Sequence, residues 1–227
     1  MKRFLLLLLV LPVHSFGAQS EVTLSFTQTS GNSDTDTLAL SYQVEKDFSL
    51  WELSSDGSYL YKRDGGKETA NRLNLEGTLG RKLSDSLSLE LYGFVYRDPF
   101  SGYDFRGGAG PGLSWKVSRN LTLSGKLAYT YNDYTGGGSQ SYSQVEFRGD
   151  YSRMLTANLS FEQSLSYQLS LKNSDDYFIH WLTSFKVPFG SGLSLNLSYR
   201  IDYQNLLPED ARYHTDRTFL VGVTYQF

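Results

Sequence analysis

The feature that most restricts the fold is a strict alternation of apolar and polar side chains near the end of the sequence. In residues 193–205, apolar side chains from Leu193 to Tyr203 alternate with polar ones from Ser194 to Gln204, and residues 217–227 repeat the pattern up to Phe227. Successive side chains of a β-strand point to opposite faces, so each segment predicts a strand with one apolar and one polar face. Pairing the last strand with the first removes an exposed apolar edge that would otherwise promote aggregation. The alternation therefore predicts a closed barrel.

Short tight turns and longer polar loops separate these segments in regular succession, and twelve strands result. An even number of tilted, alternating strands of about ten residues is typical of a transmembrane antiparallel up-and-down β-barrel, with short periplasmic turns and longer extracellular loops. We expect an all-β barrel of about 12 strands, with 10 or 14 as alternatives and both mature termini periplasmic. The predicted strands are residues 21–29, 35–45, 50–62, 70–83, 86–97, 105–117, 121–134, 142–153, 158–171, 177–187, 193–205 and 215–227.

The beginning of the sequence predicts export. Lys2 and Arg3 precede an apolar run over residues 4–13, and the small residues Ser15 and Gly17 suit cleavage after Gly17, with a cut after Ala18 as the alternative. Residues 1–17 are thus a predicted signal peptide and 18–227 a single barrel domain of the Gram-negative outer membrane. The formal net charge of -3 lacks the basic excess of nucleic-acid-binding proteins, so no nucleic acid partner is expected.

Because a charge facing the bilayer midplane costs about 2 to 4 kcal/mol, the charged positions of the strands are expected to face the lumen. Eight acidic and nine basic residues fall there. Mixed charges favour a lumen filled by ion pairs, whereas a selective pore usually has charges of one dominant sign. Two alternatives therefore remain, a structural barrel and a narrow channel for ions or small solutes. The candidates for conduction or a charge network are Arg72, Glu76, Arg106, Lys126, Glu146, Arg148, Glu162, Arg200 and Asp202. The other lumen-facing charges are Glu52, Asp56, Lys62, Lys82, Glu90, Lys116, Asp150 and Lys186.

Three glycines, Gly108, Gly110 and Gly112, recur at period two on the predicted lumen face. A hairpin centred on Gly102 would place Tyr96, Phe94 and Tyr92 opposite them, in that order. Aromatic side chains over strand glycines support sharp bending of a barrel wall. Pro111 lacks a backbone donor, so a bulge or a weak point in the ladder is expected beside these glycines.

An outer-rim hydrolase is the remaining alternative. The mature sequence has two histidines, His180 on the predicted lumen face and His214 in the last outer loop near Glu209, Asp210 and Asp216. Acidic loop clusters are usually solvated, so no catalytic residue, no metal ligand set and no cofactor is predicted. Basic side chains near the outer loops suit contacts with lipopolysaccharide phosphates; these are Arg63, Lys67, Lys172, Arg212 and Arg217.

Several stretches of the mature chain stand out, namely Gly31-Asn32, Thr37-Leu38-Ala39-Leu40, Thr69-Ala70-Asn71-Arg72, residues 97–106 and Tyr225-Gln226-Phe227. They resemble the YdiY-type salt-induced outer-membrane proteins, and the resemblance covers essentially the whole mature chain. It implies an outer-membrane barrel, an envelope component of osmotic or salt stress, and no catalytic residues. The ending at Tyr225 and Phe227 also resembles the signal that the barrel-assembly machinery recognises. The expected partners of this monomer are therefore that machinery, outer-membrane lipid and lipopolysaccharide.

Overall fold

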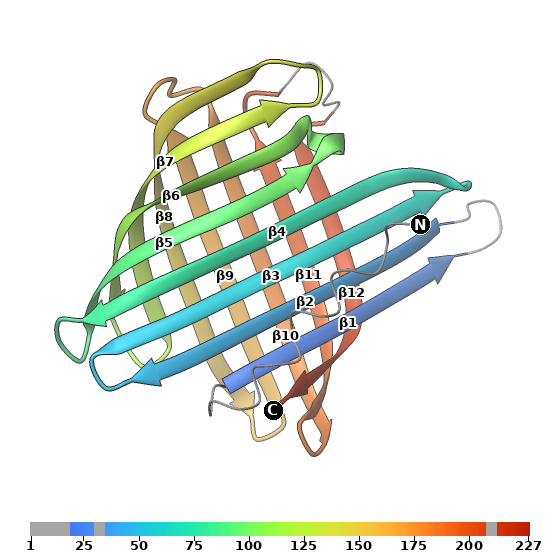
Figure 1. The fold of residues 1–227 in the computed structure, drawn as a ribbon. Helices are drawn as coiled ribbons and strands as arrows, with labels where there is room; N and C mark the ends of the chain where they lie inside the picture. The colour runs from blue at the N-terminus through green and yellow to red at the C-terminus, as the bar shows by residue number, and fades with distance from the viewer. Residues whose placement is uncertain (1–18, 30–34, 208–212) are drawn as a thin grey trace.

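The computed structural model describes residues 19–29, 35–207 and 213–227, so the predicted signal peptide and the loop residues Asn32, Glu209, Asp210 and Arg212 lie outside the described residues. The described chain contains twelve β-strands and the short 3₁₀ helix η3 (Pro99–Ser101) (Figure 1). The strands are β1 (Gln19–Thr29), β2 (Thr35–Phe48), β3 (Trp51–Asp64), β4 (Lys67–Lys82), β5 (Leu87–Asp98), β6 (Tyr103–Lys116), β7 (Leu121–Tyr134), β8 (Ser139–Thr156), β9 (Leu159–Ser170), β10 (Tyr177–Gly190), β11 (Leu193–Gln204) and β12 (Thr215–Gln226).

Each strand pairs antiparallel with its neighbours in sequence, and β1 pairs with β12, so the sheet closes into a barrel. The predicted fold and the strand number of twelve are confirmed. Within the described residues, none of the helical structure is long and apolar enough to cross a membrane.

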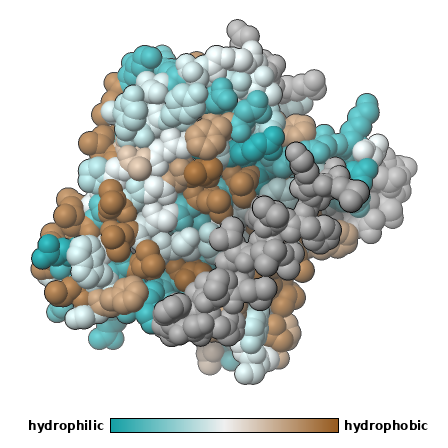
Figure 2. Space-filling model, in the orientation of Figure 1, coloured by the Kyte–Doolittle hydropathy of each residue, from teal (hydrophilic) through white to brown (hydrophobic). Residues whose placement is uncertain are grey.

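The barrel has its apolar side chains outside and its polar side chains inside. Leu24, Phe26 and Phe219 are 54%, 60% and 61% exposed on the outer face, whereas Arg72 and Glu146 are buried on the inner face. Apolar residues are prominent on the face that Figure 2 shows, and hydrophilic residues gather towards its top. This distribution is the one that a lipid-embedded barrel requires, because lipid accepts apolar groups and a lumen accepts polar ones.

The connection between β3 and β4 is tighter than the sequence predicts. A loop over residues 63–69 is expected, but the two strands extend to Asp64 and from Lys67, which leaves Gly65 and Gly66 as the turn. Both glycines have positive φ, 53° and 79°, which a two-residue hairpin of this kind demands.

The predicted register between β5 and β6 is wrong by two residues. Tyr92 lies opposite Gly110 and Phe94 opposite Gly108, while Tyr96 faces Arg106. The hairpin is not centred on Gly102, because η3 occupies its tip and register shifts follow on both strands. Two of the three predicted aromatic residues, Tyr92 and Phe94, still lie opposite glycines. The pairing of aromatic residues with glycines is therefore present, with partners other than those predicted.

Gly110 and Pro111 mark a weak point between β6 and β7, as predicted. The ladder runs to Ala109 and resumes at Gly112 in the same register, without pairs at the two residues between and without a bulge there. A Cβ at Gly110 would overlap the carbonyl oxygen of Leu127, so glycine is required for this close backbone approach.

Candidate functional site: the barrel lumen

The lumen contains two adjoining cavities. The loop cavity, of about 360 Å³, reaches Ser101 beside η3 and His214 before β12. The terminal cavity, of about 650 Å³, reaches Gln19 and Gln226 at the opposite end of the barrel. We call these two ends the loop rim and the terminal rim. Both cavities share charged wall residues, so their linings together extend from rim to rim; the shared charged residues are Glu21, Asp56, Glu76, Arg148, Glu162 and Lys186.

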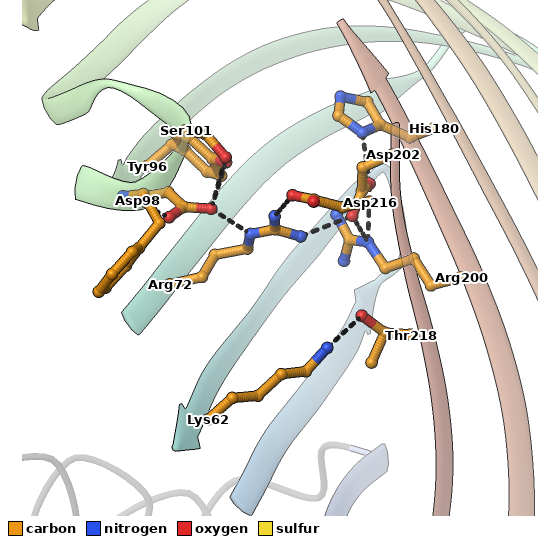
Figure 3. A network of polar contacts seen from close by, with 11 residues as sticks. Lys62, Arg72, Tyr96, Asp98, Ser101, His180, Arg200, Asp202, Asp216 and Thr218 are labelled. Atoms are coloured by element: carbon orange, nitrogen blue, oxygen red, sulfur yellow. Dashed lines mark hydrogen bonds and ion pairs between the residues drawn. The ribbon is translucent and has the colours of Figure 1, made fainter. Parts of the chain in front are cut away.

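Arg72 on β4 crosses the lumen and binds three carboxylates. Its Nε lies 2.7 Å from Asp98 at the end of β5, Nη1 lies 2.6 Å from Asp202 on β11, and Nη2 lies 2.8 Å from Asp216 on β12 (Figure 3). We call these four residues the Arg72 cluster. Arg72 and Asp98 are only 7% and 1% exposed. The planar guanidinium can donate in three directions at once, which a lysine ammonium does not match geometrically.

Further partners fix the carboxylates of the cluster. Asp98 accepts hydrogen bonds from the hydroxyl groups of Tyr96, at 3.2 Å, and Ser101, at 2.9 Å. Asp202 lies 2.7 Å from Nδ1 of His180 and accepts from Nε of Arg200 at 2.8 Å (Figure 3). The charges of the Arg72 cluster are thus all paired, which is the condition for tolerating them inside a protein.

A second charge group lies on the β4–β8 side of the lumen. Nζ of Lys126 lies 2.5 Å from Glu76 and 3.9 Å from Glu146, and it covers the ring of Tyr92 at 4.6 Å. Nε2 of Gln168 donates to Glu146 at 2.6 Å. Lys126 therefore links β7 to β4 across the two strands between them.

Arg106 has no carboxylate within ion-pair distance in the described chain. It donates to Gln144 at 2.8 Å and to Gln168 at 3.2 Å, and its guanidinium lies 4.1 Å from the centre of the Phe178 ring. Such a cation–π contact stabilises a desolvated cation. Nearby, Asp176 lies in the connection between β9 and β10, where burial raises the pKa of its carboxyl and the Arg106 charge partly opposes that rise.

Tyr103 also spans the lumen near the loop rim. Its hydroxyl accepts a hydrogen bond of 2.8 Å from Nε2 of Gln204 on β11, and its ring contacts those of Tyr134 and Phe178. Tyr103 is 2% exposed, so this end of the lumen is narrowed by packed aromatic side chains.

Towards the terminal rim, Lys186 on β10 bridges two carboxylates. Its Nζ lies 2.8 Å from Glu21 on β1 and 3.1 Å from Glu162 on β9. Lys82 contacts Asp47 at 2.7 Å, and Lys116 lies 3.4 Å from Glu52. The cross-lumen contacts therefore continue along the whole barrel.

The structure places all nine charged candidates in the lumen. Eight line the loop cavity, while Lys126 lines the terminal cavity. Arg148 pairs with Asp150 on its own strand, at 3.0 Å. Sequence reasoning missed Asp98, Asp216 and Glu21 as lumen partners. Asp98 was assigned to a loop, and Asp216 and Glu21 lie at the ends of predicted strands, outside the lumen-facing set. The Asp-Pro pair at 98–99 is a helix-start signal that indicates an ordered, capped turn there.

Both histidines contact groups of the barrel wall. His180 bonds to Asp202, and Nδ1 of His214 lies 2.8 Å from the carbonyl oxygen of Gln204. No group of three or more potential ligands among the described side chains is arranged to hold a metal. Tyr225 and Phe227 lie together at the terminal rim, with ring centres 5.5 Å apart.

Two solved structures share this architecture. The NanC porin matches with a TM-score of 0.56 and 12% identity, covering 92% of this chain and 100% of the porin. The COG4313 outer membrane channel from Pseudomonas putida F1 matches with a TM-score of 0.52 and 10% identity, covering 93% of this chain and 96% of the channel. At such low identity the likeness establishes the fold, which is that of outer-membrane β-barrels.

At the sequence level, no curated protein matches this chain significantly. The model of one protein family, described as "Protein of unknown function, DUF481", matches residues 22–227. That match covers the whole predicted barrel and is consistent with the resemblance to the YdiY-type proteins. The chain belongs to the DUF481 family.

Proposed function

We propose that this protein is a narrow channel of the Gram-negative outer membrane that passes small ions, with a preference for cations. The observation that carries the proposal is the pair of adjoining polar cavities whose linings extend from one rim to the other. A lumen that is lined by many polar and charged side chains holds water, and a barrel of twelve strands leaves only a small cross-section once its inner side chains are in place.

The cation preference follows from the charges of the terminal cavity. Carboxylates outnumber basic side chains there by seven to four, and a ring with an excess of carboxylates attracts cations. The seven are Glu21, Glu45, Asp56, Glu76, Glu90, Asp150 and Glu162, and the four are Arg119, Lys126, Arg148 and Lys186.

The proposal also includes an orientation of the barrel in the outer membrane. The terminal rim, with both strand termini, faces the periplasm, and the loop rim faces outwards. Export by the predicted signal peptide and insertion by the barrel-assembly machinery, which would read Tyr225 and Phe227, lead to this orientation. At the loop rim Arg63, Lys67, Lys172 and Arg217 would contact lipopolysaccharide phosphates. Leu24, Phe26 and Phe219 on the outer face support contact with lipid.

Conductance in a planar bilayer tests the channel. The refolded protein is expected to give small, reproducible current steps that grow with KCl concentration. Under a KCl gradient, the reversal potential is expected to shift towards that of potassium. A correctly folded protein that stays silent at all salt concentrations would contradict conduction.

The second candidate is a filled barrel with a structural role in the envelope under osmotic or salt stress. The Arg72 cluster favours it, because three ion pairs cross the lumen where the loop cavity is narrowed. Deletion of the gene would then reduce growth at high salt. A variant that folds but does not conduct would restore that growth, whereas a channel role demands conduction.

A further inference from the structure

The seam that closes the barrel is shorter than any other strand pairing. β1 and β12 share five residue pairs, from Glu21↔Gln226 to Ser25↔Gly222, whereas each other neighbouring pair shares at least ten. Beyond Ser25, β1 pairs with β2 alone, and from Thr215 to Val221 β12 pairs with β11 alone. The two strands lie side by side near the C-terminus and separate towards the loop rim (Figure 1). Residues 26–29 of β1 and 215–221 of β12 thus have no strand partner on the side where the two strands face each other. We call these two segments the open seam.

Gly222 marks the point where the strands part. A Cβ at this residue would overlap the hydroxyl oxygen of Ser25 and lie 2.7 Å from the carbonyl oxygen of Leu24. The backbones therefore approach too closely here for any side chain, and glycine permits it. The departure of β12 from β1 is built into the sequence at this residue.

Side chains hold the open seam from the lumen. Nζ of Lys62 on β3 donates to the hydroxyl oxygen of Thr218 on β12 at 3.1 Å, and Arg72 on β4 contacts Asp216 at 2.8 Å (Figure 3). Thr218 is 6% exposed, so the inner faces of β3 and β12 lie close together. Two side-chain contacts thus replace a backbone ladder at this part of the wall.

The open seam offers both polar and apolar contacts. Backbone N–H and C=O groups of a strand alternate between its two sides, so each edge presents groups that no strand pairs. Leaving such groups unsatisfied in lipid is unfavourable. Outside, Phe26 and Phe219 are 60% and 61% exposed. Inside, Lys62 has no carboxylate within 4 Å of its ammonium group among the described residues, and it donates a hydrogen bond to the neutral hydroxyl group of Thr218.

We propose that the open seam is a lateral binding site for an anionic amphiphile of the surrounding membrane. The head group would bind Lys62 and the free N–H groups of the strand edges, and the acyl chain would pack against Phe26 and Phe219. Charge complementarity at Lys62 and the apolar outer wall select this occupant over a peptide strand, which would need no cation. The inference rests on the proposed membrane location but does not depend on conduction.

Paired cysteines test the separation of the strands, since the chain has no cysteine. The variant Leu24→Cys with Val223→Cys joins two outward-facing residues that are opposite each other in the ladder. Phe26→Cys with Val221→Cys occupies the next outward position of the same register. After refolding in phosphatidylcholine vesicles and mild oxidation, the first pair is expected to form a disulfide and the second is not. Equal cross-linking of both pairs would overturn the open seam.

The occupant is tested by photolabelling with a dodecyl phosphate that carries a diazirine in its tail. Label is expected on peptides that contain residues 26–29 or 215–221, and to fall about tenfold in Lys62→Met, the effect of losing one charged contact. Lys116→Met removes an exposed lysine near the terminal rim, far from the open seam, and should leave the label unchanged. A neutral dodecyl glucoside with the same diazirine should not label the seam.

Two results would overturn the binding site. One is seam labelling that is equal in the wild type and Lys62→Met, and the other is a loss of label in Lys116→Met as large as that in Lys62→Met. If the proposed membrane location is wrong, the experiment gives a different result. In that case the variant with cysteines at 24 and 223 would not insert into vesicles and would not show the altered electrophoretic mobility of a folded barrel.

Discussion

Arg72 donates to Asp98 over 2.7 Å inside a barrel whose outer surface is apolar, and both side chains are buried. In a soluble protein the same pair would lie in an interior of apolar side chains. Here the interior contains many charges, and those of the Arg72 cluster are paired across the lumen, so the stability of the barrel depends on that pairing.

Replacing Arg72 by methionine is expected to destabilise the folded barrel by about 3 to 5 kcal/mol, because Asp98 and Asp202 would lose a buried counter-charge. Urea unfolding in lipid vesicles measures the change. Arg200→Met is the control, since Asp202 keeps Arg72 and His180 when Arg200 is removed. Similar unfolding midpoints for both variants would contradict a special role of the Arg72 cluster.

Gly110→Ala is expected to lower the refolding yield strongly, because the added Cβ would overlap the carbonyl oxygen of Leu127 on the adjacent strand. Gly77→Ala serves as the matched control, since a Cβ there meets nothing within 4 Å. The fraction that becomes resistant to protease in vesicles reports the yield. The close approach of β6 and β7 would be refuted by wild-type yield of the Gly110 variant.

Lys186→Gln is expected to increase cation selectivity, because Glu21 and Glu162 would lose their shared counter-charge where the two cavities meet. One unit charge at 4 Å in water contributes about 1 kcal/mol, which corresponds to about a fivefold change in the permeability ratio. Reversal potentials under a KCl gradient measure that ratio. Lys67→Gln, at the exposed turn, should leave the permeability ratio unchanged. An equal shift in both variants would argue against a specific effect of the Lys186 charge on the permeating ions.

Tyr103→Phe is expected to reduce stability by about 1 kcal/mol, since one hydrogen bond to Gln204 across the lumen is lost. Gln204 retains its bond to the carbonyl oxygen of Leu206, which limits the cost. Tyr129→Phe alters an outward side chain that is 65% exposed and should have almost no effect. Thermal unfolding of the two variants provides the comparison, and equal transition temperatures would show that the cross-lumen bond contributes nothing.

The strands and their two faces were predictable from the sequence, because a period of two residues is a local property. Each segment from β1 to β12 has its own alternation, and the lumen-facing charges such as Glu76 and Arg148 follow from it directly. The register of β5 and β6 was not predictable in the same way. It depends on η3 and on the register shifts beside it, which add residues without altering the alternation of the strands.

The ion-pair partners of the lumen charges could not be predicted from the sequence either. Arg72 was predicted to face the lumen, but its contacts with Asp202 and Asp216 depend on strand tilt and on which strands face each other across the barrel. Asp98 is 1% exposed although its sequence context indicates a loop. The open seam was not predicted either, since a closed barrel is expected to pair its last strand fully.

The Arg72 cluster also constrains the order of folding. Asp202 and Asp216 follow Arg72 by 130 and 144 residues, so the guanidinium has only Asp98 as a counter-charge until the last hairpin arrives. Contacts between residues so distant in sequence form slowly, because a long stretch of chain must be ordered first. The full set of counter-charges around Arg72 and the closure of the wall therefore both depend on the last hairpin, β11 and β12.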